Sequence, residues 1–421
     1  MKTSSERVIA LECPECGATY PLELHTICKE CWSPLKVKYD FEVIKEQISK
    51  EDLRTRIFNH WRYIELLPLT DSTHIVSLND GGTPLQRCEN LGAELGLREL
   101  YVKNDTINPT LSFKDRPASV GVSKCLELGI HTVGCASTGN LAASTAAHAA
   151  KAGVPCYIFV PSTIESSKIT QTAIHGANIV GIEGTYDDAN RLGVLAAETF
   201  NWGLLNINVR PYYTEGSKTI AFEVCEQLNW TPPDNIIIPM GSGALLCSVY
   251  RALYELDTIG FTKTNGTRIS GAQPVGCAPI VTSRHTKNDI FPIEKPQTIA
   301  KSLAIGNPAS GYEAINIINS TKGSAAAPTD LEITDAIKLL AKKEGIYTEP
   351  AGGVTLAGLI KLVEQGEIAK DESVVVLITG NGFKAHQTIT NLIQEIPIIK
   401  PTIEALKNYT HYKEDVILVE S

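Results

Sequence analysis

Asn108-Pro-Thr-Leu-Ser-Phe-Lys-Asp-Arg116 marks the point at which a loop of this chain passes into a helix. Pro109 and the small residues around it indicate a turn, and the residues from Asp115 onward read as helical, so Lys114 stands at the helix start. A lysine set beside Phe113 and turn-forming residues is poorly placed as a solvated surface charge, whereas a desolvated lysine amine is suited to capturing a carbonyl group. The stretch therefore predicts that Lys114 forms a Schiff base.

Segments typical of strands and helices alternate along the chain after residue 98. The pattern favours strands at 99–103, 131–136, 156–160, 178–183 and 204–207, and helices at 115–129, 141–151, 165–175 and 186–200. Such alternation with short connections indicates βαβ units and a parallel sheet that is covered by helices on both faces. Sheets of this kind bind ligands beyond the carboxyl ends of their strands, where loops lead into helices.

Three further loops lie where an expected strand ends. Ser137-Thr-Gly-Asn140 leads into an expected helix, Gly241-Ser-Gly243 follows an apolar run, and so does Thr379-Gly-Asn-Gly382. Glycines let backbone amides approach an anion closely, and the first turn of a helix adds partial positive charge. Taken singly, the first loop also fits a simple helix cap, and the third fits a turn that merely ends a strand.

Together with Asn108 to Arg116, these loops resemble the cofactor-holding loops of the fold-type II pyridoxal-phosphate enzymes, and the nearest resemblance is to the threonine synthase family. Gly81-Gly-Thr-Pro-Leu85 also matches a segment near the start of that family's catalytic region. The resemblance covers the chain from its first cysteines to about Leu392. It implies an α/β fold of the tryptophan synthase β type, with two parallel-sheet domains and pyridoxal 5′-phosphate as the cofactor.

The resemblance also implies a role for each loop. Lys114 would carry the cofactor as a Schiff base beside Phe113, Asn140 would bond the ring hydroxyl, and Thr379 would meet the pyridine nitrogen. The cofactor phosphate would lie on the glycine loop, where this chain departs from the family's longer glycine set; that loop comprises Gly241, Ser242, Gly243, Ala244 and Leu245. The substrate's α-carboxylate would be held by Ser137, Thr138 and Gly139, and Ser112 would also contact the substrate.

The segment 206–218 mixes amides, hydroxyls and cations, which are the groups that a phosphorylated substrate needs. Arginine suits bidentate contact with phosphate and lysine acts as a point charge, so Asn208, Arg210 and Lys218 are the candidate contacts. In another branch of the family an arginine stands where this chain has Tyr213. That departure leaves the identity of the phosphate ligands open.

The reaction that the resemblance implies converts O-phospho-L-homoserine and water into L-threonine and phosphate. Three alternatives stay open. Cysteate synthase would use phosphoserine and sulfite, and a threonine or serine dehydratase would need no phosphate ligands. A metabolite sensor without catalysis would not need Lys114.

Four of the eleven cysteines form two Cys-x-x-Cys pairs near the start of the chain, Cys13 with Cys16 and Cys28 with Cys31. Four thiolates complete a closed tetrahedral site, so we expect a zinc ribbon that holds a structural zinc ion; the alternative is a pair of knuckles that is empty or reduced. The remaining cysteines are scattered through segments that look like core, which indicates reduced thiols and no disulfide framework.

A length of 421 residues predicts two to three domains. The net charge of −9, from 38 basic and 47 acidic residues, argues against a nucleic-acid-coating surface and favours a small metabolite as partner. No segment reaches the ~20 apolar residues of a membrane span, and residues 1–20 lack the apolar core of a secretory signal, so the expected location is the cytoplasm, away from membranes.

The expected domains follow from these motifs. Residues 1–40 form the zinc ribbon, 41–80 a helical arm, 81–395 the catalytic region and 396–421 a C-terminal extension. Within the catalytic region, 115–210 form a smaller domain, and 81–114 join 211–395 in a larger one. The arm is expected either to be a plain connector or to pack on the main body or on a second subunit, which would make a homodimer.

Overall fold

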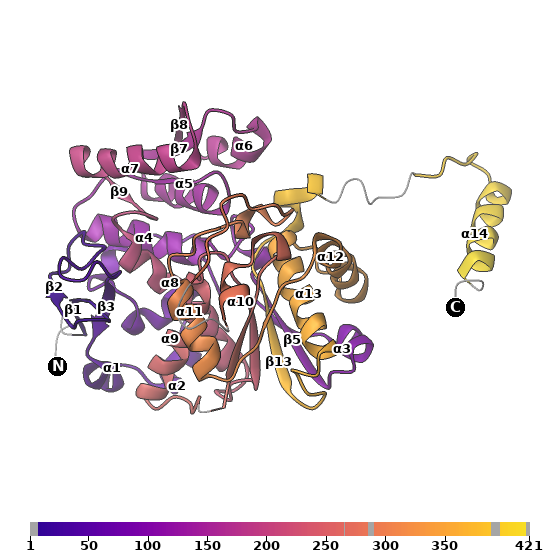
Figure 1. Cartoon of the computed structure of the whole chain (residues 1–421), viewed down its shortest axis with the longest axis horizontal. Coiled ribbons are helices and arrows are strands. Elements are labelled where there is room, and N and C mark those ends of the chain that lie inside the picture. Colours follow the sequence, from indigo (N-terminus) through magenta and orange to yellow (C-terminus); the bar gives the residue numbers. More distant parts are fainter. Residues whose placement is uncertain (1–6, 265, 285–289, 389–395, 418–421) are drawn as a thin grey trace. The chain divides into compact units, whose positions relative to one another are not determined.

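The computed structural model describes residues 7–264, 266–284, 290–388 and 396–417 (Figure 1). The chain divides into two units, Met1–Ala385 and His386–Ser421. The second unit contains one long helix, α14 (Ile403–Ile417). All the candidate site residues belong to the first unit, whose elements are described below.

The larger sheet of the first unit has six strands. Their order is β12 (Ala325–Ala326), β11 (Arg268–Ala272), β10 (Asn235–Pro239), β13 (Ser373–Ile378), β5 (Glu99–Asn104) and β4 (Leu85–Arg87). All neighbours run parallel except β4, which pairs antiparallel with β5. The central strands β10 and β13 are almost wholly buried, as expected for apolar runs covered on both faces. Helices packed around this sheet include α3 (Glu89–Leu95), α9 (Ala244–Thr258), α12 (Asp330–Glu344) and α13 (Pro350–Glu364).

The smaller sheet has four parallel strands in the order β8 (Asn178–Ile182), β7 (Cys156–Pro161), β6 (Val133–Ala136) and β9 (Gly203–Leu204). Helices α5 (Asn140–Ala152) and α7 (Tyr186–Phe200) pack against β6 and β7, and α6 (Ser166–Ile174) packs against α5. The strand expected at 204–207 is shorter, because the side chain of Asn208 accepts a hydrogen bond from the backbone N–H of Leu204 and turns the chain.

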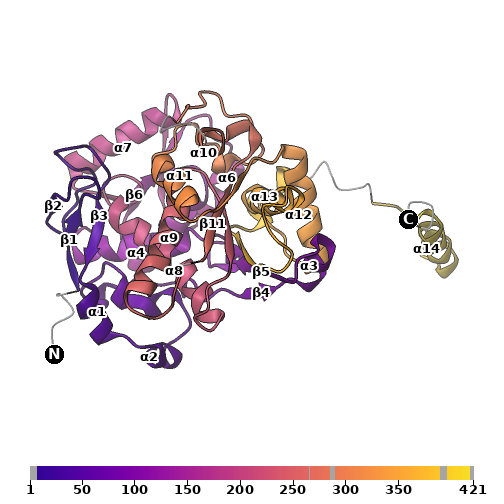
Figure 2. The same ribbon diagram turned by 60° about the horizontal axis from the view of Figure 1, so that its bottom comes forward.

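Two buried helices, α4 (Asp115–Glu127) and α8 (Arg210–Gln227), pack against each other in the middle of the unit (Figure 2). Helix α4 also contacts α5, and α8 also contacts α9. Most of both helices is buried, including polar and charged side chains, so their ion pairs form in a water-excluded environment.

The N-terminal module is a three-stranded antiparallel sheet in the order β2 (Thr19–Tyr20), β1 (Val8–Glu12) and β3 (Lys36–Tyr39). The arm after it contains α1 (Phe41–Gln47), α2 (Lys50–Thr55) and 3-10 turns at His60–Leu66 and Ser72–His74. It packs on the main body: the Trp61 indole donates to Ser119 Oγ at 2.9 Å, and the Tyr63 and Phe222 ring centroids are 5.3 Å apart.

The remaining elements of the first unit are short. They are α10 (Pro279–Ser283), α11 (Gly311–Ser320) and 3-10 turns at Asp105–Ile107, Val275–Cys277 and Lys301–Leu303, while the 3-10 turn Gly382–Thr388 spans the boundary between the units. Among the described residues, no helix combines the length and the apolar character that crossing a membrane requires. The two parallel sheets confirm the predicted α/β fold.

Candidate active site

The predicted loops meet at one edge of the larger sheet. Strands β10, β13 and β5 are neighbours and run parallel, so the loops that follow them emerge on the same side. Gly241 follows β10, Thr379 follows β13, and the loop that carries Lys114 follows β5 and one 3-10 turn. The parallel sheet thus gathers three segments that are far apart in the sequence.

Lys114 is the N-cap residue of α4 and is half-buried. Its Nζ donates a hydrogen bond to the Tyr213 hydroxyl at 3.0 Å and lies 4.7 Å from the centroid of the Phe113 ring. The next residue, Asp115, fixes the turn because its carboxylate accepts from the Thr110 N–H at 2.7 Å and from the Thr110 hydroxyl at 2.6 Å. The hydrogen bonds of Asp115 thus brace the turn that carries the amine, and the contacts of the amine within the described residues are with the Tyr213 hydroxyl and the Phe113 and Tyr213 rings.

The loop after β13 holds the lysine loop from the other side. The Phe113 N–H donates to the Thr379 carbonyl at 2.9 Å, and the Asn381 N–H donates to the Leu111 carbonyl at 3.0 Å. The side chain of Ser112 is fully buried, yet its hydroxyl has no partner among the described residues. An unpaired buried hydroxyl is costly, so the Ser112 hydroxyl is available to a polar ligand; its contact with substrate stays a prediction.

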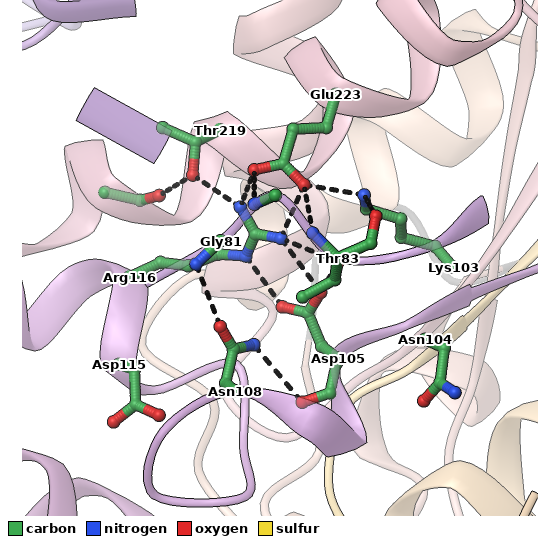
Figure 3. Close-up of polar contacts among 12 residues, drawn as sticks. Gly81, Thr83, Lys103, Asn104, Asp105, Asn108, Asp115, Arg116, Thr219 and Glu223 are labelled. Carbon is green, nitrogen blue, oxygen red and sulfur yellow. Dashed lines mark hydrogen bonds and ion pairs between the residues drawn. The ribbon is translucent and has the colours of Figure 1, made fainter. Parts of the chain in front are cut away.

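Arg116 anchors the helix that carries Lys114, two residues beyond it. Its guanidinium donates to Asp105 at 2.7 and 2.9 Å and to Glu223 at 2.6 and 2.8 Å (Figure 3). All three side chains are fully buried. Paired forks of this kind fix geometry as well as charge, because two parallel hydrogen bonds set the plane of the arginine.

Glu223 on α8 joins the rest of this cluster. Its carboxylate also accepts from Lys103 Nζ at 2.6 Å and from the backbone N–H groups of Gly82 and Thr83. Burial alone would raise the pKa of Glu223, but Arg116 and Lys103 outweigh it and hold that pKa well below its usual range. These contacts tie together the Gly81-Gly82-Thr83 turn, β5, α4 and α8 (Figure 3).

Asn140, at the first turn of α5, faces a buried carboxylate. Its amide donates to Glu349 at 2.9 and 3.2 Å. Glu349 is the N-cap residue of α13, and its backbone N–H bonds the Gly380 carbonyl at 3.0 Å. Burial raises the pKa of Glu349, and the bond from Asn140 opposes that shift. This contact joins the two sheets across the site, and the sequence signal for it is the segment Glu349-Pro-Ala-Gly-Gly353.

The glycine loop between β10 and α9 has the form of an anion site. Gly243 has φ +85°, and a Cβ there would lie 2.8 Å from the Ser310 carbonyl oxygen, so only glycine fits without strain. It is the N-cap of α9 and has no side-chain cap; the Ala244 N–H makes a long bond of 3.5 Å to the Ser242 hydroxyl, and the N–H of Leu245 has no hydrogen-bond partner among the described residues. Ala244 and Leu245 lie in that turn and would contribute backbone donors only.

The Ser137-Thr138-Gly139 loop ends β6 and opens α5. Gly139 is the N-cap of α5 and has no side-chain cap, and it is exposed. Ser137 and Thr138 are half-buried. The backbone N–H groups of this first turn are therefore open to an anion, in keeping with the predicted carboxylate contact.

The predicted phosphate segment is largely the first turns of α8, and its three candidates differ. Arg210 begins α8, is half-buried and has no side-chain partner among the described residues. Asn208 is occupied locally, because its amide donates to the Trp202 carbonyl at 2.8 Å. Lys218 is fully buried, and its Nζ lies 2.7 Å from Glu255 and 2.6 Å from Glu215. The polar groups of Asn208 and Lys218 thus have partners within the protein, and their contact with substrate stays a prediction.

The four N-terminal cysteines form one cluster. Their sulfur atoms all lie within 4.8 Å of one another, with Cys13 and Cys31 3.3 Å apart and Cys16 and Cys28 3.5 Å apart. Four thiols at these separations suit a tetrahedral metal with bonds of about 2.3 Å.

Comparison with known proteins agrees with this geometry. The family model described as "Pyridoxal-phosphate dependent enzyme" matches residues 76–380. A threonine synthase from Methanocaldococcus jannaschii is 44% identical over 94% of this chain and 98% of its own length. One from Methanosarcina acetivorans is 40% identical over 94% of this chain and 97% of its own length.

Solved structures agree on the fold. Threonine deaminase isoform 2 from Solanum lycopersicum superposes with a TM-score of 0.63 at 24% identity, covering 74% of this chain and 84% of that one. Maize serine racemase superposes with a TM-score of 0.62 at 21% identity, covering 74% of this chain and 91% of that one.

The two sheets and the lysine-bearing loop define a pyridoxal-phosphate-dependent enzyme of fold type II. Within that class the chain belongs to the threonine synthase family.

Proposed function

We propose that the chain converts O-phospho-L-homoserine and water into L-threonine and inorganic phosphate. The observation that carries this proposal is the placement of Lys114: its loop is bonded to Thr379 through the Phe113 N–H, and its amine donates to the Tyr213 hydroxyl. Its similarity to threonine synthases over nearly the whole chain supports the same reaction.

The residues around Lys114 fit the cofactor. Lys114 would bind its aldehyde carbon, Asn140 and Thr379 would contact the ring, and the glycine loop before α9 would take the phosphate tail. The unpaired Ser112 hydroxyl supports a polar ligand here. When bound, pyridoxal phosphate supplies an electron sink that stabilises a carbanion next to the substrate nitrogen.

The chain's own groups would supply orientation and proton transfer. The backbone amides at the start of α5 hold the substrate carboxylate, and the free cation of Arg210 binds the phosphate. The Lys114 amine, once free of the cofactor, takes the Cα proton and would pass it on to the bound cofactor; neutral again, it then takes a second proton from Cβ of the substrate. The buried ion pairs of Arg116 with Asp105 and Glu223 hold the helix that carries the amine in one position during both steps.

We further propose that the four-cysteine cluster holds a structural zinc ion, because the sulfur separations suit a closed tetrahedral site. We also keep the division into a smaller domain at 115–210 and a larger domain around it; the four-stranded sheet falls within the first range. A homodimer stays a prediction.

Threonine and phosphate formed from O-phosphohomoserine would test the function. The purified chain, loaded with pyridoxal phosphate, should release both products in equal amounts, and Lys114→Ala should lose at least about 10³-fold in kcat. Cysteate formed from phosphoserine and sulfite, without threonine from O-phosphohomoserine, would contradict the proposal. So would release of ammonia and a keto acid from threonine or serine at rates above those of threonine synthesis.

A further inference from the structure

The Tyr213 hydroxyl contacts the Lys114 amine, and its own proton has no acceptor among the described residues. It lies in the first turn of α8, is 7% exposed, and its hydroxyl oxygen accepts the hydrogen bond from Lys114 Nζ at 3.0 Å. Among the described residues, no group accepts the proton of the Tyr213 hydroxyl itself. A nearly buried phenol with an unused donor is poised to give a hydrogen bond to whatever enters the site.

The neighbouring residue Tyr212 differs from Tyr213, because its hydroxyl already donates to another group. The Tyr212 hydroxyl donates to the Glu23 carbonyl at 2.8 Å, and its ring lies 5.0 Å from Lys124 Nζ, so that side chain serves the packing of the N-terminal module. Arg210 and Tyr213 are three residues apart on α8 and share one helix face. This face of α8 thus carries a guanidinium that has no partner among the described residues and the phenol that contacts Lys114.

The chemistry of the substrate explains why a proton donor is needed here. When the Cγ–O bond of a phosphate monoester dianion breaks, the oxygen departs with the electron pair and would leave as a trianion. A proton delivered to that oxygen during bond breaking gives hydrogen phosphate, and general acids of this kind contribute about 10²- to 10⁴-fold to the rate. Arg210 neutralises charge but holds no transferable proton, because arginine stays protonated in proteins.

We propose that Lys114 and Tyr213 form a proton relay that carries the Cβ proton of the substrate to the departing phosphate oxygen. This inference rests on the proposed function. The Cβ–H bond breaks and its proton goes to Lys114 Nζ, while its electron pair forms the Cβ–Cγ double bond. The Cγ–O bond breaks with its electron pair on oxygen; Lys114 gives a proton to the Tyr213 oxygen, and Tyr213 gives its own to the phosphate. Both side chains end the step as they began it.

Tyr213→Phe removes the hydroxyl and keeps the ring. We expect kcat for phosphate release from O-phosphohomoserine to fall at least about 100-fold, with KM changed less than about threefold. Deuterium exchange at Cα of L-2-aminobutyrate, the analogue without a leaving group, needs Lys114 alone and should stay within about threefold of wild type. In the cofactor-free protein, acetylation of Lys114 by acetic anhydride should become faster, because the amine has lost a hydrogen-bond partner.

Tyr212→Phe is the matched control and should leave all three readouts near wild type. Tyr213→His retains a polar donor; it should recover part of the lost activity and serves as the second variant if Tyr213→Phe does not fold. Phosphate release by Tyr213→Phe at the wild-type rate would overturn the relay. Loss of Cα exchange in step with phosphate release would also overturn it, since Tyr213 would then only position Lys114. A wild-type chain that releases no phosphate would overturn the proposed function itself.

Discussion

Asp115 and Arg116, the two charged residues that follow Lys114 in the sequence, fix the position of the loop and helix that carry the lysine. Asp115 closes the Thr110 turn, and Arg116 is clamped between Asp105 and Glu223 with no exposure to solvent. Neither side chain points its charge at Lys114 in any described contact. The Asp-Arg pair therefore sets the position of the amine and leaves its chemistry to the groups at the tip, namely Phe113, Tyr213 and the incoming ligands.

The buried His60 beside this cluster should make the fold sensitive to acid. Neither ring nitrogen has a partner among the described residues, and burial lowers the pKa of His60 to about 4; Asp80 and Glu223 oppose that shift, and Arg116 adds to it. In the unfolded chain a histidine has a pKa of about 6.5. Between about pH 6.5 and pH 4, His60 is therefore protonated in the unfolded state and neutral in the folded state. Stability is therefore lost as the pH falls from about 6.5 towards 4.

His60→Leu should remove that loss. The free energy of unfolding is compared at pH 7 and pH 4.5. We expect its decrease between these pH values to be about 2.5 kcal/mol smaller in His60→Leu than in the wild type. Urea unfolding at both pH values measures the difference, with the exposed His131→Asn as control. The raised pKa of His148, which Asp80 causes against the effect of burial, acts with the opposite sign but is common to both proteins and cancels. Equal acid sensitivity of the two proteins would contradict the argument.

Single residues were predictable where a loop motif defines their place. Lys114 and Thr379 follow the neighbouring parallel strands β5 and β13, which brings their loops to one edge of the larger sheet, and Asn140 follows β6 of the smaller sheet. Tyr213 and Glu349 were not predictable as partners of Lys114 and Asn140, because these contacts join segments 99 and 209 residues apart. Such contacts depend on how helices pack, which loop motifs do not reveal.

At the scale of elements, α8 links the site to the rest of the unit. Its first turn carries Arg210 and Tyr213, its third buries Lys218 between Glu215 and Glu255, and its fourth carries Glu223. The sequence 206–218 looked like a polar substrate loop because amides, hydroxyls and cations alternate with Pro211 and Gly216. Pro211 instead starts the helix, where its missing N–H is harmless, and most of the polar side chains after it turn inward.

Arg210→Ala and Lys218→Met should separate the two roles of this helix. Loss of the unpaired guanidinium should raise KM for O-phosphohomoserine by about tenfold or more and leave stability nearly unchanged, because a charge-assisted bond to phosphate contributes about 1.5–3 kcal/mol. Loss of the buried ammonium should instead cost about 3–5 kcal/mol of stability, since Glu215 and Glu255 would keep only Arg251 as a cationic partner. Steady-state kinetics and urea unfolding of both variants measure the contrast. A larger KM effect in Lys218→Met would reverse the assignment.

Most strands and helices of the two sheets follow from hydrophobic runs and turn residues. The expected helix at 186–200 coincides with α7, and the apolar run before Thr379 is β13. The shortened β9 shows the limit, because the side chain of Asn208 ends a strand that its apolar residues favour. The pattern of apolar residues thus predicts that a strand or helix is present. Where the strand or helix ends depends on hydrogen bonds from side chains in the neighbouring turns.

At the scale of the whole first unit, the N-terminal module is bound to the helices of the active site. The buried Tyr39 hydroxyl donates to Glu215 on α8 at 2.7 Å, and the Tyr212 hydroxyl of the same helix donates to the Glu23 carbonyl at 2.8 Å. Lys36 also pairs with Glu313 on α11. Tyr212 lies directly before Tyr213, so a shift of the module would be transmitted to the residue that contacts Lys114.

Removal of the metal should therefore affect both stability and catalysis, although the cysteines lie in a separate module. We expect about one zinc ion per chain by elemental analysis, and a chelator or Cys28→Ala should lower the melting temperature by several degrees, because a structural zinc site contributes directly to folding. kcat should fall with it, since loosening of the whole module weakens the Tyr39, Tyr212 and Lys36 contacts together, whereas Tyr212→Phe removes only one of them. Cys88→Ala, a buried cysteine outside the cluster, should keep its zinc and its response to the chelator. Zinc loss with unchanged melting temperature and activity would show that the module folds without its metal, as an empty pair of knuckles would.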